Sequence, residues 1–232
     1  MKVLAIESSC DDTSFSVVSD DKSIDFIKTI NHRKFHKKHG GVIPEMAARQ
    51  HLDIMDYLQK SIKKFDFKKI DAIAATYGPG LIGGLIVGSS FAKGLSISRQ
   101  KKLIPVNHLQ AHLLSPRLTS NLSFPYLCLL VSGGNTALVI VKSPKKFVTL
   151  GSTIDDSAGE CFDKVSKALG LGYPGGPIIE KLALKGDHHK YKLPLPLTKV
   201  KNCNFSFSGL KTAAIDIINK NKNNKRFLEN FC

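Results

Sequence analysis

Short apolar runs alternate with longer stretches of helical periodicity along the chain, separated by clusters of glycine, proline and polar residues. Residues 2–7 and 13–18 predict two strands of a hairpin whose turn carries small and acidic residues, and residues 24–30 predict a third strand. Pro44 then predicts the first turn of an amphipathic helix that runs to about Phe65.

A unit of strand, glycine-rich turn and helix follows. Residues 70–76 predict a strand, the glycines of 78–84 a turn, the residues up to about Ser98 a helix, and residues 102–106 a further, parallel strand. The glycine-rich turn lacks the Lys-Ser/Thr of a triphosphatase loop and does not fit G-x-G-x-x-G. We therefore interpret it as a tight turn that lets the helix pack close to the sheet.

A second strand pair repeats the N-terminal pattern. Residues 127–131 and 136–141 predict a hairpin around the turn Ser132-Gly133-Gly134-Asn135. Glycines at such a turn carry no Cβ penalty, and their backbone amides can converge on a phosphate. Two similar hairpins indicate a duplicated architecture, which we divide into lobes at residues 1–124 and 125–232.

An acidic segment, residues 155–163, stands out in an otherwise basic chain. Asp156 or Ser157 can cap the helix that follows, and acidic residues in its first turns suit the positive end of the helix dipole. The same carboxylates also suit sugar hydroxyls or a cation, so both interpretations stay open. After Gly170, residues 172–177 predict a glycine-proline corner before a helix at 178–184, and residues 205–212 open another helix.

Composition limits the class of protein. The 232 residues, 42% of them hydrophobic, suffice for one large domain or two lobes, and no apolar run resembles a signal peptide or a membrane span. Five scattered cysteines without a C-x-x-C pair fit a reducing compartment, so we expect a cytoplasmic protein. The net charge of +15 favours a polyanionic partner such as nucleic acid, although a lysine- and asparagine-rich proteome gives the same excess.

Two segments rich in histidine differ in their chemistry. His108 and His112 lie four residues apart, so on a helix both rings share one face and can bind one divalent cation, unless they are simply surface histidines. No glutamate stands between them as in H-E-x-x-H, which argues against a metallopeptidase. In contrast, the histidines of 31–41 are diluted by lysines, so we expect an exposed basic loop there, with tRNA contact through 34–39 as one possibility.

Taken in chain order, these motifs resemble the TsaD family, the tRNA N6-adenosine threonylcarbamoyltransferases, in its bacterial and organellar branch. The resemblance covers essentially the whole chain and rests on the segments 6–13, 40–49, 107–112, 131–134, 155–163, 172–177 and 205–211. It implies an α/β fold of the actin-like ATPase (sugar kinase/Hsp70) superfamily with two lobes of related topology.

The resemblance also implies an activity and a site. The family transfers the threonylcarbamoyl group from threonylcarbamoyl-adenylate to N6 of adenosine 37 in tRNAs reading codons that begin with A. It acts with TsaB and TsaE partners and with a synthase that supplies the adenylate. His108 and His112 match the family's ligands for a divalent metal, usually iron (Fe2+). The positions that match the adenylate site are Leu130, Val131, Ser132, Gly133, Gly134, Asp163, Gly176 and Glu180.

Two departures from the family pattern bear on this expectation. Asn135 stands where the family commonly has histidine, a minor change. Family members also continue past the point that corresponds to Cys232, with a substrate-binding asparagine turn and a metal-binding aspartate. We therefore expect a C-terminally truncated second lobe, and we keep an inactive fragment with partner binding at most as an alternative. A cation held by two histidines alone is bound weakly.

Overall fold

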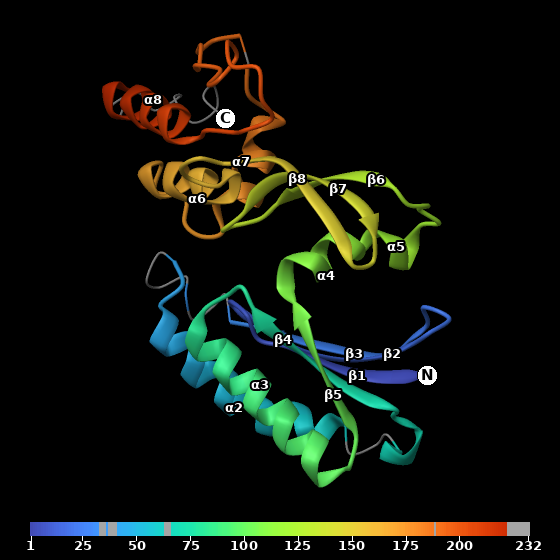
Figure 1. Ribbon diagram of the computed structural model, residues 1–232. Coiled ribbons are helices and arrows are strands. Elements are labelled where there is room, and N and C mark those ends of the chain that lie inside the picture. Colours follow the sequence, from blue (N-terminus) through green and yellow to red (C-terminus); the bar gives the residue numbers. More distant parts are fainter. Residues whose placement is uncertain (33–35, 37–40, 63–65, 188, 222–232) are drawn as a thin grey trace. The chain divides into compact units, whose positions relative to one another are not determined.

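A computed structural model of the chain describes residues 1–232 except 33–35, 37–40, 63–65, 188 and 222–232 (Figure 1). The chain divides into two compact units, Met1–Ser120 and Asn121–Cys232. The predicted boundary between residues 124 and 125 lies shortly after this division.

The first unit is built on a five-stranded sheet of order β3-β2-β1-β4-β5. Its strands are β1 (Lys2–Glu7), β2 (Asp12–Ser19), β3 (Ile24–Asn31), β4 (Ala72–Gly78) and β5 (Lys102–Asn107). The first three strands pair antiparallel, as the predicted hairpin and third strand require, whereas β4 joins β1 in parallel and β5 joins β4 in parallel. The carboxyl ends of β1, β4 and β5 consequently meet at one edge of the sheet.

Two long helices cover one face of this sheet. α2 (Pro44–Ile62) begins at the proline that the sequence indicated, α3 is Ile82–Ser98, and a 3-10 turn at Phe67–Lys69 leads into β4. Figure 1 shows α2 and α3 side by side along the sheet. The apolar side chains that alternate along the strands point to the same side of the sheet, and the apolar side chains that repeat every 3.6 residues along the helices point back toward them. Together they form one core. Its fully buried members include Leu4, Phe15, Leu58, Ile73 and Ala92.

Glycines of α3 let this helix approach the end of β1. A Cβ at Gly88 would lie 2.0 Å from Ser8 Oγ, and one at Gly84 would lie 2.3 Å from the Ser8 carbonyl oxygen. The Ser8 hydroxyl donates a hydrogen bond to the Gly84 carbonyl oxygen at 2.9 Å. The interpretation of the glycine-rich segment as a close-packing device is confirmed.

The expectation of an exposed loop at residues 31–41 is wrong for two of its histidines. His32 is 3% exposed and His36 is fully buried, while residues 33–35 and 37–40 of the predicted basic loop lie outside the described part of the chain. Aromatic packing explains the difference, because the His32 ring lies 4.7 Å from that of His51 on α2. The sequence pattern of residues 31–41 does not indicate this contact, because His51 belongs to another element.

The hydroxyl of Thr13 joins the two packed histidines. Its Oγ1 lies 3.0 Å from Nε2 of His32 and 2.7 Å from Nδ1 of His51. The second ring nitrogen of His51 lies 3.0 Å from the carbonyl oxygen of Cys10. Burial lowers the pKa of His32 to about 4 and also lowers the pKa of His51, so both rings are neutral at pH 7.

Over its described residues, the second unit contains an antiparallel sheet of order β6-β7-β8 and three helices. Its strands are β6 (Tyr126–Val131), β7 (Thr136–Ser143) and β8 (Lys146–Ser152), and its helices are α6 (Ala158–Ala168), α7 (Gly175–Ala183) and α8 (Ser208–Lys220). The second predicted hairpin is thus confirmed, whereas β8 had no counterpart in the sequence analysis. Its pairing with β7 repeats the pairing of β3 with β2.

Helices α6 and α8 share the small core of the second unit. Its buried members are Cys161, Val165, Ala214 and Ile218. By contrast, Leu127 and Leu129 on β6 are 61% and 56% exposed, and β6 pairs only with β7 among the described strands. Over the described residues, no helix combines the length and apolar character needed to cross a membrane.

Candidate functional site

The two predicted metal ligands sit on one short helix at the carboxyl end of β5. Asn107 caps α4 (His108–Leu114) through its side chain, which accepts a hydrogen bond from the backbone N–H of Gln110 at 3.1 Å. His108 and His112 then face one another a turn apart, with their Nε2 atoms 3.1 Å apart and their rings at 88°. α4 ends at Leu114, and α5 (Pro116–Thr119) begins at the proline two residues later.

The spacing of these nitrogens suits a shared cation. A divalent metal held at about 2.1 Å by two imidazole nitrogens in adjacent coordination positions keeps them about 3.0–3.4 Å apart. The separation of 3.1 Å between the Nε2 atoms of His108 and His112 falls in that range. Both residues therefore fit a metal as two of its ligands. Across the described ranges, however, no group of three or more His, Cys, Asp or Glu side chains is placed to hold one.

Glu7, at the end of β1, lies beside the Nδ1 side of the His108 ring. The sequence pattern did not single out Glu7 as a site residue. Its Oε2 is 3.3 Å from Nδ1 of His108 and accepts a hydrogen bond from the Thr76 hydroxyl at 2.5 Å. Its Oε1 accepts one from the backbone N–H of Ser9 at 2.5 Å. The carboxyl ends of parallel strands are the usual place for functional groups in α/β sheets. A polar residue at or near the end of each parallel strand is the sequence signal that would have pointed to Glu7 and Thr76.

The charge state of this cluster follows from its contacts. Burial raises the pKa of Glu7, but hydrogen bonds from His108, Ser9 and Thr76 outweigh it and bring the pKa to about 2. Burial and the neighbouring His108 lower the pKa of His112. An ionised carboxylate thus stands beside a histidine pair whose exposed member is neutral at pH 7, the form in which imidazole binds metals.

In the glycine turn of the second unit, Ser132-Gly133-Gly134-Asn135, the backbone of the two glycines is exposed to solvent. The Ser132 N–H donates to the Asn135 carbonyl oxygen at 2.8 Å, and the Ser132 hydroxyl accepts from the Asn135 N–H at 3.0 Å. Gly133 and Gly134 are exposed, and no atom lies within 4 Å of a Cβ built on either. Of the two strand residues proposed with this turn, Leu130 is buried and Val131 is 53% exposed.

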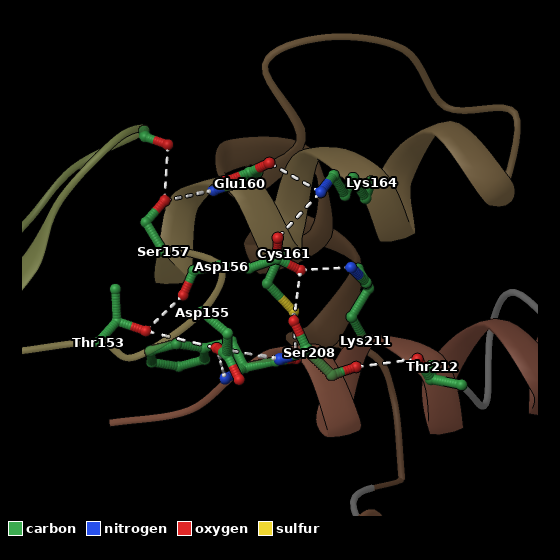
Figure 2. A network of polar contacts seen from close by, with 12 residues as sticks. Thr153, Asp155, Asp156, Ser157, Glu160, Cys161, Lys164, Ser208, Lys211 and Thr212 are labelled. Atoms are coloured by element: carbon green, nitrogen blue, oxygen red, sulfur yellow. Dashed lines mark hydrogen bonds and ion pairs between the residues drawn. The ribbon is translucent and has the colours of Figure 1, made fainter. Parts of the chain in front are cut away.

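Ser157 attaches this glycine turn to the first turn of α6. Its hydroxyl donates to the Gly133 carbonyl oxygen at 2.7 Å and accepts from the backbone N–H of Glu160 at 3.2 Å (Figure 2). A Cβ at Gly159 would lie 2.5 Å from the Ser132 carbonyl oxygen, so the two segments pack backbone to backbone. Of the two candidate caps in the sequence, Ser157 is the one that caps the helix.

The remaining predicted substrate positions lie where α6 meets α7. One carboxylate oxygen of Asp163 accepts a hydrogen bond from the Gly175 N–H at 2.6 Å, at the first residue of α7. Gly176 follows, partly exposed, and Glu180 is exposed on the same helix. The predicted set therefore forms two groups within the second unit, one at the glycine turn and one at the start of α7.

The neighbouring aspartates have a structural role (Figure 2). Asp155 accepts hydrogen bonds from the Ser206 hydroxyl at 2.5 Å and from the backbone N–H of Phe207 at 2.7 Å, immediately before α8. Asp156 forms ion pairs with Lys211, and with Lys164 at 3.0 Å, and these two lysines lower its pKa to about 2. Both carboxylates thus anchor the start of α8, which favours the structural interpretation of the acidic segment.

Comparison with known proteins identifies relatives over nearly the whole chain. The family model of TsaD, tRNA N6-adenosine threonylcarbamoyltransferase, matches residues 26–232. A protein of that name from Orientia tsutsugamushi (strain Boryong) is 52% identical over 221 residues, which are 94% of this chain and 64% of the relative. Another from Thermotoga neapolitana is 50% identical over 228 residues, 96% of this chain and 68% of the relative. The chain thus spans about two thirds of the length of these relatives.

Solved structures resemble the chain in fold alone. A ROK family protein from Streptococcus pneumoniae TIGR4 matches with a TM-score of 0.51 and 16% identity, over 81% of this chain and 68% of that one. The (R)-2-hydroxyglutaryl-CoA dehydratase component A of Acidaminococcus fermentans matches with a TM-score of 0.50 and 13% identity, over 99% and 71%. The predicted α/β fold of the actin-like ATPase type is confirmed. From the family match and the identities of 50–52%, the chain belongs to the TsaD family.

Proposed function

We propose that this chain transfers the threonylcarbamoyl group from threonylcarbamoyl-adenylate to N6 of adenosine 37 in tRNAs that read codons beginning with A. The observation that carries the proposal is the family match over residues 26–232, which includes the histidine pair and the glycine turn. Relatives about half identical to the chain carry the name of this activity. We expect it to act with TsaB- and TsaE-type partners and with a synthase that supplies the adenylate.

His108 and His112 would hold the divalent metal of the reaction, which we propose to be Fe2+. Their Nε2 atoms, 3.1 Å apart, support this role. When bound, such a metal polarises a carbonyl group and stabilises the charge that develops on it during acyl transfer. Two histidines leave several coordination positions for other ligands, so we expect weak binding by this chain alone.

The glycine turn would bind the phosphate of the adenylate. Backbone amides near Ser132, Gly133 and Gly134 can converge on an anion because no side chain covers them. Asp163 belongs to the second group of predicted positions, at the start of α7, where its carboxylate accepts from the Gly175 amide and so positions Gly176 beside it. We assign the binding of the rest of the adenylate to Leu130, Val131, Gly176 and Glu180.

The charge of the chain supports a tRNA substrate. A formal net charge of +15 attracts a phosphate backbone, with an affinity that falls as salt rises. The proposed contact through residues 34–39 lies mostly outside the described residues. Charge reversal at Lys37 and Lys38 is expected to weaken tRNA binding and to flatten its salt dependence if this loop contributes.

Transfer of labelled threonylcarbamoyl to tRNA tests the proposal. The purified 232-residue chain is supplied with Fe2+, the partner proteins and threonylcarbamoyl-adenylate. We expect labelled tRNA, and we expect His112→Ala to abolish labelling while Gln110→Ala, an exposed neighbour on α4, leaves it unchanged. Absence of product that is restored by a segment supplied from a longer relative would favour the second candidate, a fragment without transfer activity.

A further inference from the structure

We propose that Glu7 is a positioning residue that fixes His108 in the tautomer with its proton on Nδ1, so that its Nε2 lone pair faces His112. The inference deepens the proposed metal role and rests on it for its functional meaning. The family resemblance implies no role for the Glu7 carboxylate, and this inference gives it one.

Three neighbouring parallel strands bring the participants together. Glu7 ends β1, Thr76 lies near the end of β4, and His108 follows β5 directly. Oε2 of Glu7 lies 3.3 Å from Nδ1 of His108, and the two side chains are 34% and 22% exposed. Partial burial limits screening by water, so the carboxylate acts on the ring at close range.

The hydrogen bonds around Glu7 determine which nitrogen carries the proton. Its oxygens already accept from the backbone N–H of Ser9 and from the Thr76 hydroxyl, both at 2.5 Å. An ionised carboxylate has only acceptors, so the ring nitrogen that faces it must present an N–H. A bare lone pair on Nδ1 at this distance would repel the carboxylate.

Ser9 is compatible with this arrangement. Its Oγ lies 3.1 Å from Nδ1 of His108, and its hydroxyl is also hydrogen-bonded to the Glu7 carboxylate. A hydroxyl has one donor and two acceptor sites, so it can donate to Glu7 while accepting from the same Nδ1–H. If Ser9 instead donated to Nδ1 of His108, the lone pair of Nδ1 would also face the Glu7 carboxylate and be repelled by it.

An asymmetry between the two metal-ligand candidates follows. With the proton of His108 on Nδ1, the contact of 3.1 Å between the Nε2 atoms requires His112 to donate its Nε2–H to His108. His108 is therefore already in its binding tautomer, whereas His112 must move its proton to Nδ1, which its exposed position allows through water. Carboxylate–histidine pairs of this kind orient ligands in many metal sites.

Nitrogen NMR of the metal-free 232-residue protein tests the proposal directly. In protein labelled with 15N-histidine, long-range N–H correlations report the tautomer of each ring, and His108→Gln assigns the resonance. We expect Nδ1–H in the native protein. In Glu7→Gln the side-chain amide can donate to Nδ1, so we expect His108 to change to Nε2–H. Asp56→Asn, an exposed carboxylate on α2, should leave the tautomer unchanged.

Zinc titration of the same variants supplies a second readout. We expect Glu7→Gln to raise the Kd for Zn2+ by about 10- to 100-fold, the usual effect of removing an outer-shell partner, and Asp56→Asn to leave it unchanged. If Glu7→Gln does not fold, Thr76→Val removes one donor to Glu7 with little change of shape and should raise the Kd by a smaller factor.

Different results would contradict the positioning role of Glu7 and the metal role of the two histidines. An Nε2–H tautomer of His108 in the native protein, or an unchanged tautomer in folded Glu7→Gln, would overturn the role of Glu7. A native protein that shows the Nδ1–H tautomer but binds no Zn2+ would support the positioning of His108 and would count against the proposed metal role.

Discussion

The hydroxyl of Ser157 donates a hydrogen bond to the carbonyl oxygen of Gly133 at 2.7 Å. One buried serine therefore caps α6 and holds the glycine turn that we assign to the phosphate. A local feature of helix architecture thus sets the position of a loop more than twenty residues earlier in the chain.

Ser157→Ala should destabilise the second unit by about 1–2 kcal/mol, because it removes the cap of α6 and leaves the Gly133 carbonyl without this donor. Urea denaturation followed by circular dichroism measures the change. The exposed Ser123→Ala serves as the matched control. Equal midpoints for the two variants would contradict the bridging role of Ser157.

Alanine substitutions at two glycines of α3 should have opposite effects. At Gly84 a Cβ would meet the Ser8 carbonyl oxygen at 2.3 Å and the His51 ring at 2.9 Å, so α3 must move away from β1. We expect Gly84→Ala to destabilise the first unit by about 1–3 kcal/mol or more. At Gly94 nothing lies within 4 Å, and Gly94→Ala should stabilise the protein by about 0.5–1 kcal/mol through helix propensity. Thermal unfolding of both variants distinguishes packing from propensity.

Thr13→Val should cost about 2–3 kcal/mol. The valine keeps the shape of threonine but removes the hydroxyl that contacts the buried rings of His32 and His51 at 3.0 and 2.7 Å. Thr29→Val, on the exposed side of β3, provides the same chemical change without that burial. Comparable urea midpoints for the two variants would show that the histidine contacts add little to stability.

Asp156 should make part of the free energy of unfolding decrease at acid pH. Its ion pairs with Lys211 and Lys164 bring its pKa from 3.8 to about 2 in the folded protein. The unfolded chain therefore binds this proton first, and the stabilisation is fully present above about pH 5 and is lost as the pH falls through 2.

Denaturation of native protein and Asp156→Asn between pH 7 and pH 2.5 measures this contribution. We expect the native protein to be more stable by about 1–2 kcal/mol at pH 7, and the difference to shrink toward acid. Asp216→Asn, at an exposed carboxylate on α8, is the matched control for the loss of one negative charge. A constant difference across the range would mean that shape, and not charge, explains the effect of Asp156→Asn.

Contacts near in sequence were predictable because they follow from periodicity and local chemistry. Both hairpins, the start of α2 at Pro44, the close packing allowed by the glycines of α3, and the shared face of His108 and His112 all depend on neighbours within a few residues or on one repeating pattern. The family resemblance added the fold of the two lobes, which no single pattern specifies.

Contacts between residues far apart in the sequence were decided by the tertiary structure. Glu7 meets His108 from 101 residues away because β4 pairs with β1 on one side and β5 on the other. The burial of His32 against His51 on α2 and the bonding of Asp155 to the start of α8 depend instead on how loops and helices pack. Hydrophobic periodicity determines which face of an element is buried, but side chains from separate elements become neighbours only when the sheet is assembled. The sequence by itself therefore determined most of the elements, although not β8, and the histidine pair, whereas the tertiary structure alone placed the Glu7 carboxylate beside His108.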